Sequence, residues 1–200
     1  MKQAGLQYEN ELKDYKIIAG VDEVGRGCVA GPVAACAVIM PQGLQISGVY
    51  DSKALSEKKR SSLSDEILKH AVCYSIKFIE SSYIDKNGIA NAVHEAMRTA
   101  VLSLDIKPGA VLIDGNAFDF KDFYCKFIIG GDKYSHTIAA ASILAKVARD
   151  SYMKAIHEQY PMYGFDKHKG YGTKAHFLAI EAYGLCEYHR KSFLKNYKGD

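Results

Sequence analysis

The chain has 200 residues, of which 48% are hydrophobic, and this is enough to bury one core of ordinary domain size. No apolar run approaches the roughly 18 to 20 residues that a membrane span requires, and the chain starts with the polar segment MKQAGLQYENELKDYK, so we expect a cytoplasmic protein. The five cysteines are odd in number and include no CxxC pair, which argues against a disulfide framework and against a zinc site.

The first half of the chain contains three predicted strands. Residues 16–22 and 32–40 are rich in Ile, Val and Ala and are bounded by Gly or Pro, which is typical of strands. An amphipathic helix is predicted over 56–71, with Ser56 as a favourable N-cap. Alternating residues then predict a strand over 72–80.

The second half of the chain alternates predicted helices with apolar runs. Apolar residues at helical spacing predict a helix over 89–104, and buried strands are predicted at 110–115 and 124–132. A long helix with many small residues is predicted over 136–160, and a final helix over 173–183 is followed by glycine. Strands that alternate with helices after an initial group of strands indicate an α/β fold with a mixed sheet.

Positive charge is concentrated near one end of the chain. The net charge is only +3, but residues 166–198 contain seven Lys or Arg against three acids, a net +4, and three histidines. Aromatic residues interleaved with these charges include Phe165, Tyr171, Phe177, Tyr188, Phe193 and Tyr197. Interleaved basic and aromatic residues are typical of a surface that binds a phosphate backbone, although a solvated lysine-rich segment has the same composition.

Four carboxylates end or follow apolar runs. These acids are Asp22 and Glu23 after IIAGV, Asp114 after AVLI, and Asp132 after FIIGG. An open α/β sheet places its site at the ends of neighbouring strands, so we expect the four side chains to converge. Crowded like charges are costly, and a divalent cation with oxygen ligands removes that cost, which favours Mg²⁺ or Mn²⁺ over zinc. For any single acid, the alternative is a turn cap or a partner of a lysine.

Three glycines follow the first strand in a pattern that resembles a dinucleotide-binding motif. The spacing of Gly25, Gly27 and Gly31 is G-x-G-x-x-x-G, however, and the next residues, PVAACAVIM, predict a strand where that motif requires a helix. We favour a loop in which the glycines on either side of Arg26 let the backbone approach a ligand closely. A tight hairpin turn explains the same glycines, and the two interpretations are compatible.

Five motifs follow one another along the chain: GVDEVGRG, DSKALSEKKR, LIDGN, GGD with AAASILAKVARD, and YGFDKHKGYGT. In this order they resemble the successive motifs of the bacterial and archaeal ribonuclease HII family, from about Ile17 to Phe193. The arginine of GRG favours this family over the related ribonuclease HIII. One departure is Cys28, where the family more often has proline, and this difference removes no functional group.

The resemblance implies a ribonuclease H fold, with a mixed sheet, surrounding helices and a C-terminal helical part that closes over nucleic acid. We expect one domain over residues 1–200, with a catalytic core at about 17–160 and a nucleic-acid-contacting segment at about 161–200. The implied activity is endonucleolytic cleavage of RNA in RNA–DNA hybrids and nicking 5′ of single ribonucleotides in duplex DNA, with 3′-hydroxyl and 5′-phosphate ends. A monomer is expected, and the segment HRKSFLKNY contains no pattern that indicates binding to a sliding clamp.

The motif matches also imply roles for individual residues. The catalytic acids and ligands of two Mg²⁺ or Mn²⁺ ions are Asp22, Glu23, Asp114 and Asp132. The loop that senses the ribose 2′-hydroxyl matches Gly25, Arg26 and Gly27, and the tyrosine that completes junction recognition matches Tyr171. Candidate phosphate contacts are Lys53, Ser142, Lys146, His168 and Lys169. For Lys53, His168 and Lys169, a surface salt bridge explains the residue equally well.

Two other functions fit parts of the sequence. A non-catalytic nucleic-acid-binding module would account for the basic and aromatic segment, and its affinity would fall with salt without turnover under any metal. A dinucleotide-dependent enzyme would account for the glycines and would bind NADH. A duplex that carries one ribonucleotide distinguishes a nuclease from both alternatives.

Overall fold

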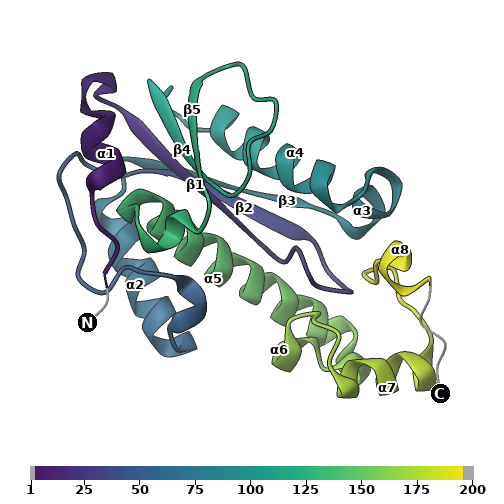
Figure 1. Cartoon of the computed structure of the whole chain (residues 1–200). Helices are drawn as coiled ribbons and strands as arrows, with labels where there is room; N and C mark the ends of the chain where they lie inside the picture. Colours follow the sequence, from purple (N-terminus) through teal and green to yellow (C-terminus); the bar gives the residue numbers. More distant parts are fainter. Residues whose placement is uncertain (1–2, 196–200) are drawn as a thin grey trace.

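The computed structural model describes residues 3–195 and contains a five-stranded sheet between helices (Figure 1). Tyr197 and Lys198 of the predicted basic segment lie outside these residues. The strands are β1 (Ile18–Val24), β2 (Val33–Ile39), β3 (Cys73–Ile79), β4 (Ala110–Asp114) and β5 (Tyr124–Ile128), in the spatial order β3-β2-β1-β4-β5. The first three strands are antiparallel neighbours, whereas β1, β4 and β5 run parallel. The predicted mixed sheet is therefore confirmed.

Helices cover both faces of this sheet. The helices of the described residues are α1 (Gln7–Glu11), α2 (Glu57–His70), α3 (Ser81–Asn87), α4 (Ile89–Leu102), α5 (His136–Gln159), α6 (Phe165–His168), α7 (Lys174–Tyr183) and α8 (Lys191–Leu194). Short 3₁₀ turns occur at Lys13–Tyr15, Ser52–Ala54, Gly131–Lys133 and Pro161–Tyr163. In Figure 1, α4 lies on one face of the sheet and α5 crosses the other. The four longest helices, α2, α4, α5 and α7, confirm the predicted helices, whereas α1, α3, α6 and α8 were not predicted.

The interior strand β2, between β3 and β1, is buried along its whole length because a helix covers each of its faces. Its residue Ala35 belongs to a core cluster with Val93 of α4, and the next residue, Cys36, belongs to a cluster with Leu144 of α5. This alternation is the two-residue period of a strand. Small residues let α5 approach β1 so closely that a Cβ atom on Gly20 would lie 2.4 Å from a backbone carbon of α5.

The predicted strand over 124–132 is shorter and more exposed in the structure. β5 ends at Ile128 and forms an edge of the sheet, where Tyr124 is 51% exposed. The next glycine, Gly130, adopts a left-handed conformation with a φ of 68°, which stops the strand and begins the 3₁₀ turn that contains Asp132. The prediction of a buried strand up to Asp132 was therefore wrong, and this acid precedes α5 instead of ending a strand.

The C-terminal helices gather at one end of the molecule (Figure 1). A separate core cluster joins Met153 of α5 and Phe165 of α6 to Ala30 in the β1–β2 connection. An isolated β-bridge between Ala30 and His189 ties the same connection to the segment before α8. The division of the domain at about residue 160 stays a prediction. Within residues 3–195, every helix is too short or too polar to cross a bilayer.

Candidate active site

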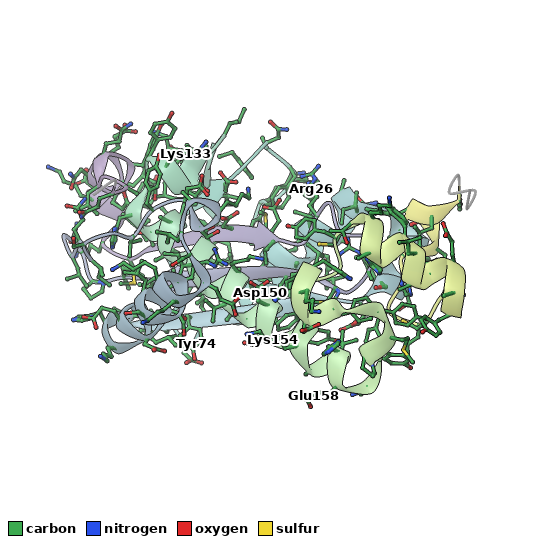
Figure 2. All side chains as sticks on the ribbon, turned by 90° about the horizontal axis from the view of Figure 1, so that it is seen from below. Arg26, Tyr74, Lys133, Asp150, Lys154 and Glu158 are labelled. Atoms are coloured by element: carbon green, nitrogen blue, oxygen red, sulfur yellow. The ribbon has the colours of Figure 1, made fainter. Side chains whose placement is uncertain are left out.

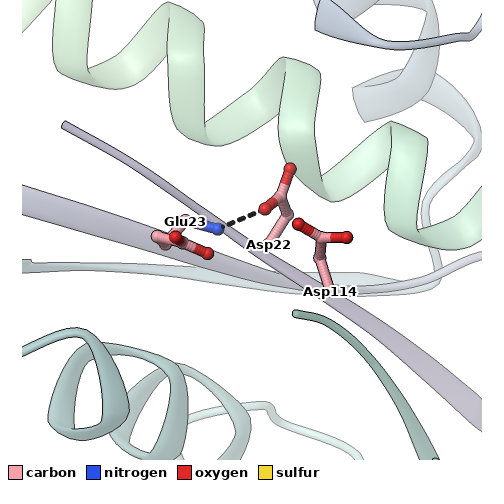
Figure 3. A group of neighbouring side chains, drawn as sticks. All are labelled: Asp22, Glu23 and Asp114. Atoms are coloured by element: carbon pink, nitrogen blue, oxygen red, sulfur yellow. Dashed lines mark hydrogen bonds between the residues drawn. The ribbon is translucent and has the colours of Figure 1, made fainter. Parts of the chain in front are cut away.

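Three carboxylates meet where β1 and β4 end side by side (Figure 3). Oxygen atoms of Asp22, Glu23 and Asp114 all lie within 4.8 Å of one another. Parallel pairing of Val21 with Ile113 places the next residue of each strand at the same edge of the sheet, which explains why Asp22 and Asp114 are neighbours. The structure thus brings together three of the four acids that the sequence predicted to converge.

Backbone amides hold two of these carboxylates in place. The Glu23 N–H donates to Oδ1 of Asp22 at 2.7 Å, and the Gly131 N–H donates to Oδ1 of Asp114 at 2.6 Å. The second bond links the end of β4 to the turn before α5. Hydrogen bonds to a carboxylate favour its charged form, so these amides help to keep the acids ionised.

Burial and mutual repulsion act in the opposite direction. Burial, followed by repulsion from Glu23 and Asp114, raises the pKa of Asp22 well above its usual value. The pKa of Glu23 is raised by burial and by Asp114, against the attraction of Arg26. Burial also raises the pKa of Asp114, despite the hydrogen bond from Gly131. One buried and two half-buried carboxylates that repel one another fit a hard divalent cation, which would remove the repulsion.

The fourth predicted acid lies close to this cluster but outside it. Asp132 is 6% exposed, in the turn before α5, and it does not belong to the group of oxygen atoms within 4.8 Å. Burial, with repulsion from Asp51 and Asp114, raises the pKa of Asp132 to about 6. Asp132 therefore contributes to the same electrostatic field as the other three acids.

A cleft of about 220 Å³ opens beside the acids. It is lined by Asp22, Glu23, Val24, Gly25, Arg26, Gly27, Ser52, Lys53, Ser142, Lys146 and Tyr171. The lining residues come from the end of β1, the β1–β2 connection, the turn before α2, the middle of α5 and the connection from α6 to α7. The predicted glycine loop, the predicted tyrosine and three of the five candidate phosphate contacts thus share one cleft with two of the acids.

The glycine loop has distinct steric requirements at its two glycines. Gly25 has a φ of 93°, and a Cβ atom there would lie 2.2 Å from Nε of Arg149, so the position admits only glycine without rearrangement. A Cβ atom at Gly27 would meet no atom within 4 Å, so this glycine borders open space. The loop leads into β2, a strand, and this contradicts a dinucleotide-binding motif, which requires a helix there.

Serine side chains connect the turn before α2 to the acids. The hydroxyls of Ser52 and Ser142 lie 2.9 Å apart, and Ser142 also hydrogen-bonds Asp22. Nη1 of Arg60 donates to the Ser52 carbonyl at 2.9 Å and thereby anchors the turn. Sequence reasoning missed Ser52 and Arg60, although both lie within the DSKALSEKKR motif, and the adjacent Lys53 was selected as a cation only.

The two lysines of the cleft interact with different acids. Burial disfavours the charged form of Lys53, but attraction to Asp22 and Asp132 outweighs it and raises the pKa of the lysine. Nζ of Lys146 lies 2.7 Å from Oδ1 of Asp150, one turn further along α5. In Figure 2, Asp150 lies between α2 and the C-terminal helices. Lys53 therefore adds positive charge to the field of the acids, whereas Lys146 forms an ion pair with Asp150.

His168 and Lys169 do not line the cleft. Nε2 of His168 lies 2.7 Å from the Tyr163 carbonyl, and its Nδ1 accepts from the Gly170 N–H at 3.2 Å. Lys169 is only 8% exposed, and its ammonium donates to the Asp166 carbonyl. Both side chains therefore stabilise the segment before Tyr171. Their contact with phosphate stays a prediction.

Comparisons with known proteins agree with this geometry. The family model described as Ribonuclease HII matches residues 19–196. A ribonuclease HII of Caldicellulosiruptor saccharolyticus is 50% identical over 189 residues, which cover 94% of this chain and 92% of that protein.

Two solved structures share the fold. The ribonuclease H2 of Pyrococcus horikoshii aligns with a TM-score of 0.75 and 24% identity, over 88% of this chain and 93% of that chain. A chain from the PCNA:RNase HII complex of Archaeoglobus fulgidus aligns with a TM-score of 0.74 and 22% identity, over 92% and 96% of the two chains. The predicted ribonuclease H fold is thus confirmed. This chain belongs to the ribonuclease HII family and is an endoribonuclease of the ribonuclease H class.

Proposed function

We propose that this ribonuclease H cleaves the RNA strand of RNA–DNA hybrids and nicks duplex DNA 5′ of a single embedded ribonucleotide, leaving 3′-hydroxyl and 5′-phosphate ends. The observation that carries this proposal is that an acidic cluster, a glycine loop and an exposed aromatic ring lie together at one cleft. A binding module for nucleic acid has no use for three clustered carboxylates that would repel a phosphate backbone. The same cluster favours catalysis over simple binding.

The acids would hold Mg²⁺ or Mn²⁺, with Asp22, Glu23 and Asp114 as ligands and Asp132 as a further carboxylate of the same site. Oxygen-only donors of this kind suit hard divalent cations. When bound, a pair of such ions supplies an activated water and stabilises the leaving 3′ oxygen in phosphodiester hydrolysis.

Other residues of the cleft would recognise the substrate. The backbone of Gly25, Arg26 and Gly27 offers N–H and C=O groups, and the 2′-hydroxyl that distinguishes a ribonucleotide is both donor and acceptor. The ring of Tyr171, 41% exposed, can pack on the sugar of the next nucleotide. Lys53 adds positive charge to the lining of the cleft, where a phosphate would be attracted. One chain supplies all of these residues, so we propose a monomer as the active form.

A duplex with one ribonucleotide tests the proposal directly. With Mg²⁺ or Mn²⁺, the wild-type protein should produce one nick 5′ of the ribonucleotide, with product ends mapped by size and by phosphatase treatment. Asp114→Asn should lower the rate by about 100-fold or more, because it removes a charge at the centre of the cluster. The matched control is Asp119→Asn, the same change at a surface position of the β4–β5 connection, which should leave the rate unchanged.

Two results would contradict the proposal. One is the absence of a metal-dependent nick by the wild-type protein, and the other is undiminished nicking by Asp114→Asn. Salt-dependent binding of the duplex without turnover under any divalent metal would instead support the binding module.

A further inference from the structure

Two guanidinium groups are completely buried next to the substrate cleft. Arg149 of α5 and Arg190, just before α8, are each 0% exposed. Burial lowers the pKa of Arg190 to about 10, so its guanidinium still carries its charge at neutral pH. Burial of a charged group costs free energy unless hydrogen bonds compensate for the lost water. An apolar residue would fill the same space at a lower cost. The acceptors of these hydrogen bonds therefore indicate why the charges are there.

Arg149 bonds to both of the segments that recognise the substrate. Its Nε donates to the Pro32 carbonyl at 2.8 Å and its Nη2 to the Ala30 carbonyl at 3.2 Å, both at the end of the glycine loop. Its Nη1 donates to the Lys169 carbonyl at 2.9 Å, two residues before Tyr171. One planar group thus fixes the loop and the tyrosine segment relative to each other.

Arg190 bonds to the glycine loop itself. Its Nη1 donates to the carbonyl of Arg26, the central residue of GRG, at 3.1 Å, and its Nε donates to the Gly31 carbonyl at 2.9 Å. The backbone N–H of Arg190 also donates to the Val29 carbonyl at 2.8 Å. The position of the Arg26 carbonyl is therefore set by a residue from the far end of the chain.

Backbone contacts complete the seam between the loop and the tyrosine segment. The Val29 and Ala30 N–H groups donate to the Gly170 carbonyl at 2.9 and 3.2 Å. A Cβ atom at Gly170 would lie 2.3 Å from the Ala30 carbonyl oxygen, so the two strands of chain are in direct contact. Sγ of Cys28 lies 3.7 Å from the Lys169 carbonyl and fills the same seam. The position of Tyr171 relative to the glycine loop is therefore fixed by several contacts.

We propose that Arg149 and Arg190 are positioning residues that set the distance between the GRG backbone and the Tyr171 ring, and thereby the selectivity for a ribonucleotide followed by a deoxyribonucleotide. This inference rests on the proposed function of the cleft. Neither guanidinium lines the cleft, so neither touches the substrate. A planar fork that donates to two or three carbonyls at fixed angles sets such a distance, and lysine, with a single ammonium group, does not reproduce it.

The test compares two substrates with Arg190→Lys. The rate constant kcat/KM is measured on a duplex with a single ribonucleotide and on a long RNA–DNA hybrid, and the ratio of the two is the readout. Arg190→Lys keeps the charge but loses the fork, so the ratio should fall by about tenfold or more. The control is Ile67→Ala, which removes buried side-chain volume in the α2–α5 cluster, away from the seam. It should lower the melting temperature and leave the ratio within about twofold.

The outcomes separate this inference from the proposed function. If the wild-type protein does not nick the single-ribonucleotide duplex, the proposed function fails. If it does, and Arg190→Lys lowers cleavage of both substrates in equal proportion, the guanidinium only supports the fold and the inference is overturned. If Arg190→Lys does not fold, Arg149→Lys repeats the measurement at the other guanidinium, and an unchanged ratio there overturns the inference in the same way.

Discussion

Replacement of Asp132 by Asn measures the electrostatic cost of the acidic site. Asp132 is only 6% exposed, and burial, with repulsion from Asp51 and Asp114, raises its pKa from 3.8 to about 6. Between pH 3.8 and about pH 6, Asp132 therefore keeps its proton in the folded protein but has lost it in the unfolded chain. Stability decreases as the pH rises through this window, and the full cost is present at pH 7. Asp132→Asn keeps the shape of the side chain and removes the charge.

The size of the effect follows from the pKa. A rise from 3.8 to about 6 is about two units, or about 3 kcal/mol at 1.36 kcal/mol per unit. Solvent in the open site and local relaxation screen the charge, so we expect a gain of roughly 1 to 2 kcal/mol. For a chain of this length, that gain raises the melting temperature by about 2 to 8 °C at pH 7. At pH 4.5 the gain should shrink to about a third, because this pH lies close to the unfolded pKa of 3.8, where protonation of the acid costs little free energy.

The assay is thermal melting followed by circular dichroism, with a chelator present, at pH 7 and pH 4.5. Asp119→Asn, on the exposed β4–β5 connection, is the control and should melt like the wild type at both pH values. Added Mg²⁺ should stabilise the wild type more than Asp132→Asn, because a ligand stabilises the folded state that binds it. The reasoning fails if Asp132→Asn melts at or below the wild type at pH 7, or if its gain is the same at both pH values.

The remaining predictions concern packing, pH and the tyrosine of the cleft. Gly20→Ala places a Cβ atom 2.4 Å from a backbone carbon of Thr137, so it should lower the free energy of unfolding by about 2 kcal/mol and lower the melting temperature. Gly5→Ala places its Cβ atom 3.7 Å from the nearest atom and should leave the melting temperature unchanged. Burial lowers the pKa of His176 from 6.5 to about 4, so stability should fall as the pH falls through this range, and urea unfolding of His176→Gln should show a weaker pH dependence. Tyr171→Ala should reduce nicking of a single-ribonucleotide duplex by about tenfold with a small change in melting temperature, and equal losses of activity and stability would make the tyrosine structural.

The long elements could be predicted from the sequence because each contains several periods of its pattern. The helix predicted over 136–160 is observed as His136–Gln159, and Pro161 ends it as expected. The short helices α1, α3, α6 and α8 contain one or two turns, too few for a period to be visible, and tertiary contacts stabilise them. The same limit explains the error at β5, where a glycine pair converted the end of an apolar run into a turn.

The acids of the site could be found from the sequence because strand ends and motifs both identified them. The buried arginines could not be found in this way. Sequence reasoning counted Lys169 and Arg190 among the cations of an exposed basic segment, and the structure buries both side chains. Their burial depends on contacts with a loop more than 130 positions away, such as the bond from Arg190 to Arg26, and no local pattern encodes such a contact.

The bond between Arg190 and the Arg26 carbonyl also orders events in time, because it joins residues 164 positions apart. A ribosome that adds about 5 to 20 residues per second needs roughly 10 to 30 s to travel between the two codons. During this interval a nascent chain already carries Asp22, Glu23 and the glycine loop, but the Arg26 carbonyl still lacks the guanidinium that fixes its position. Translation that stalls before codon 190 would therefore yield a chain that has its acidic residues but lacks one of the two arginines that set its choice of target.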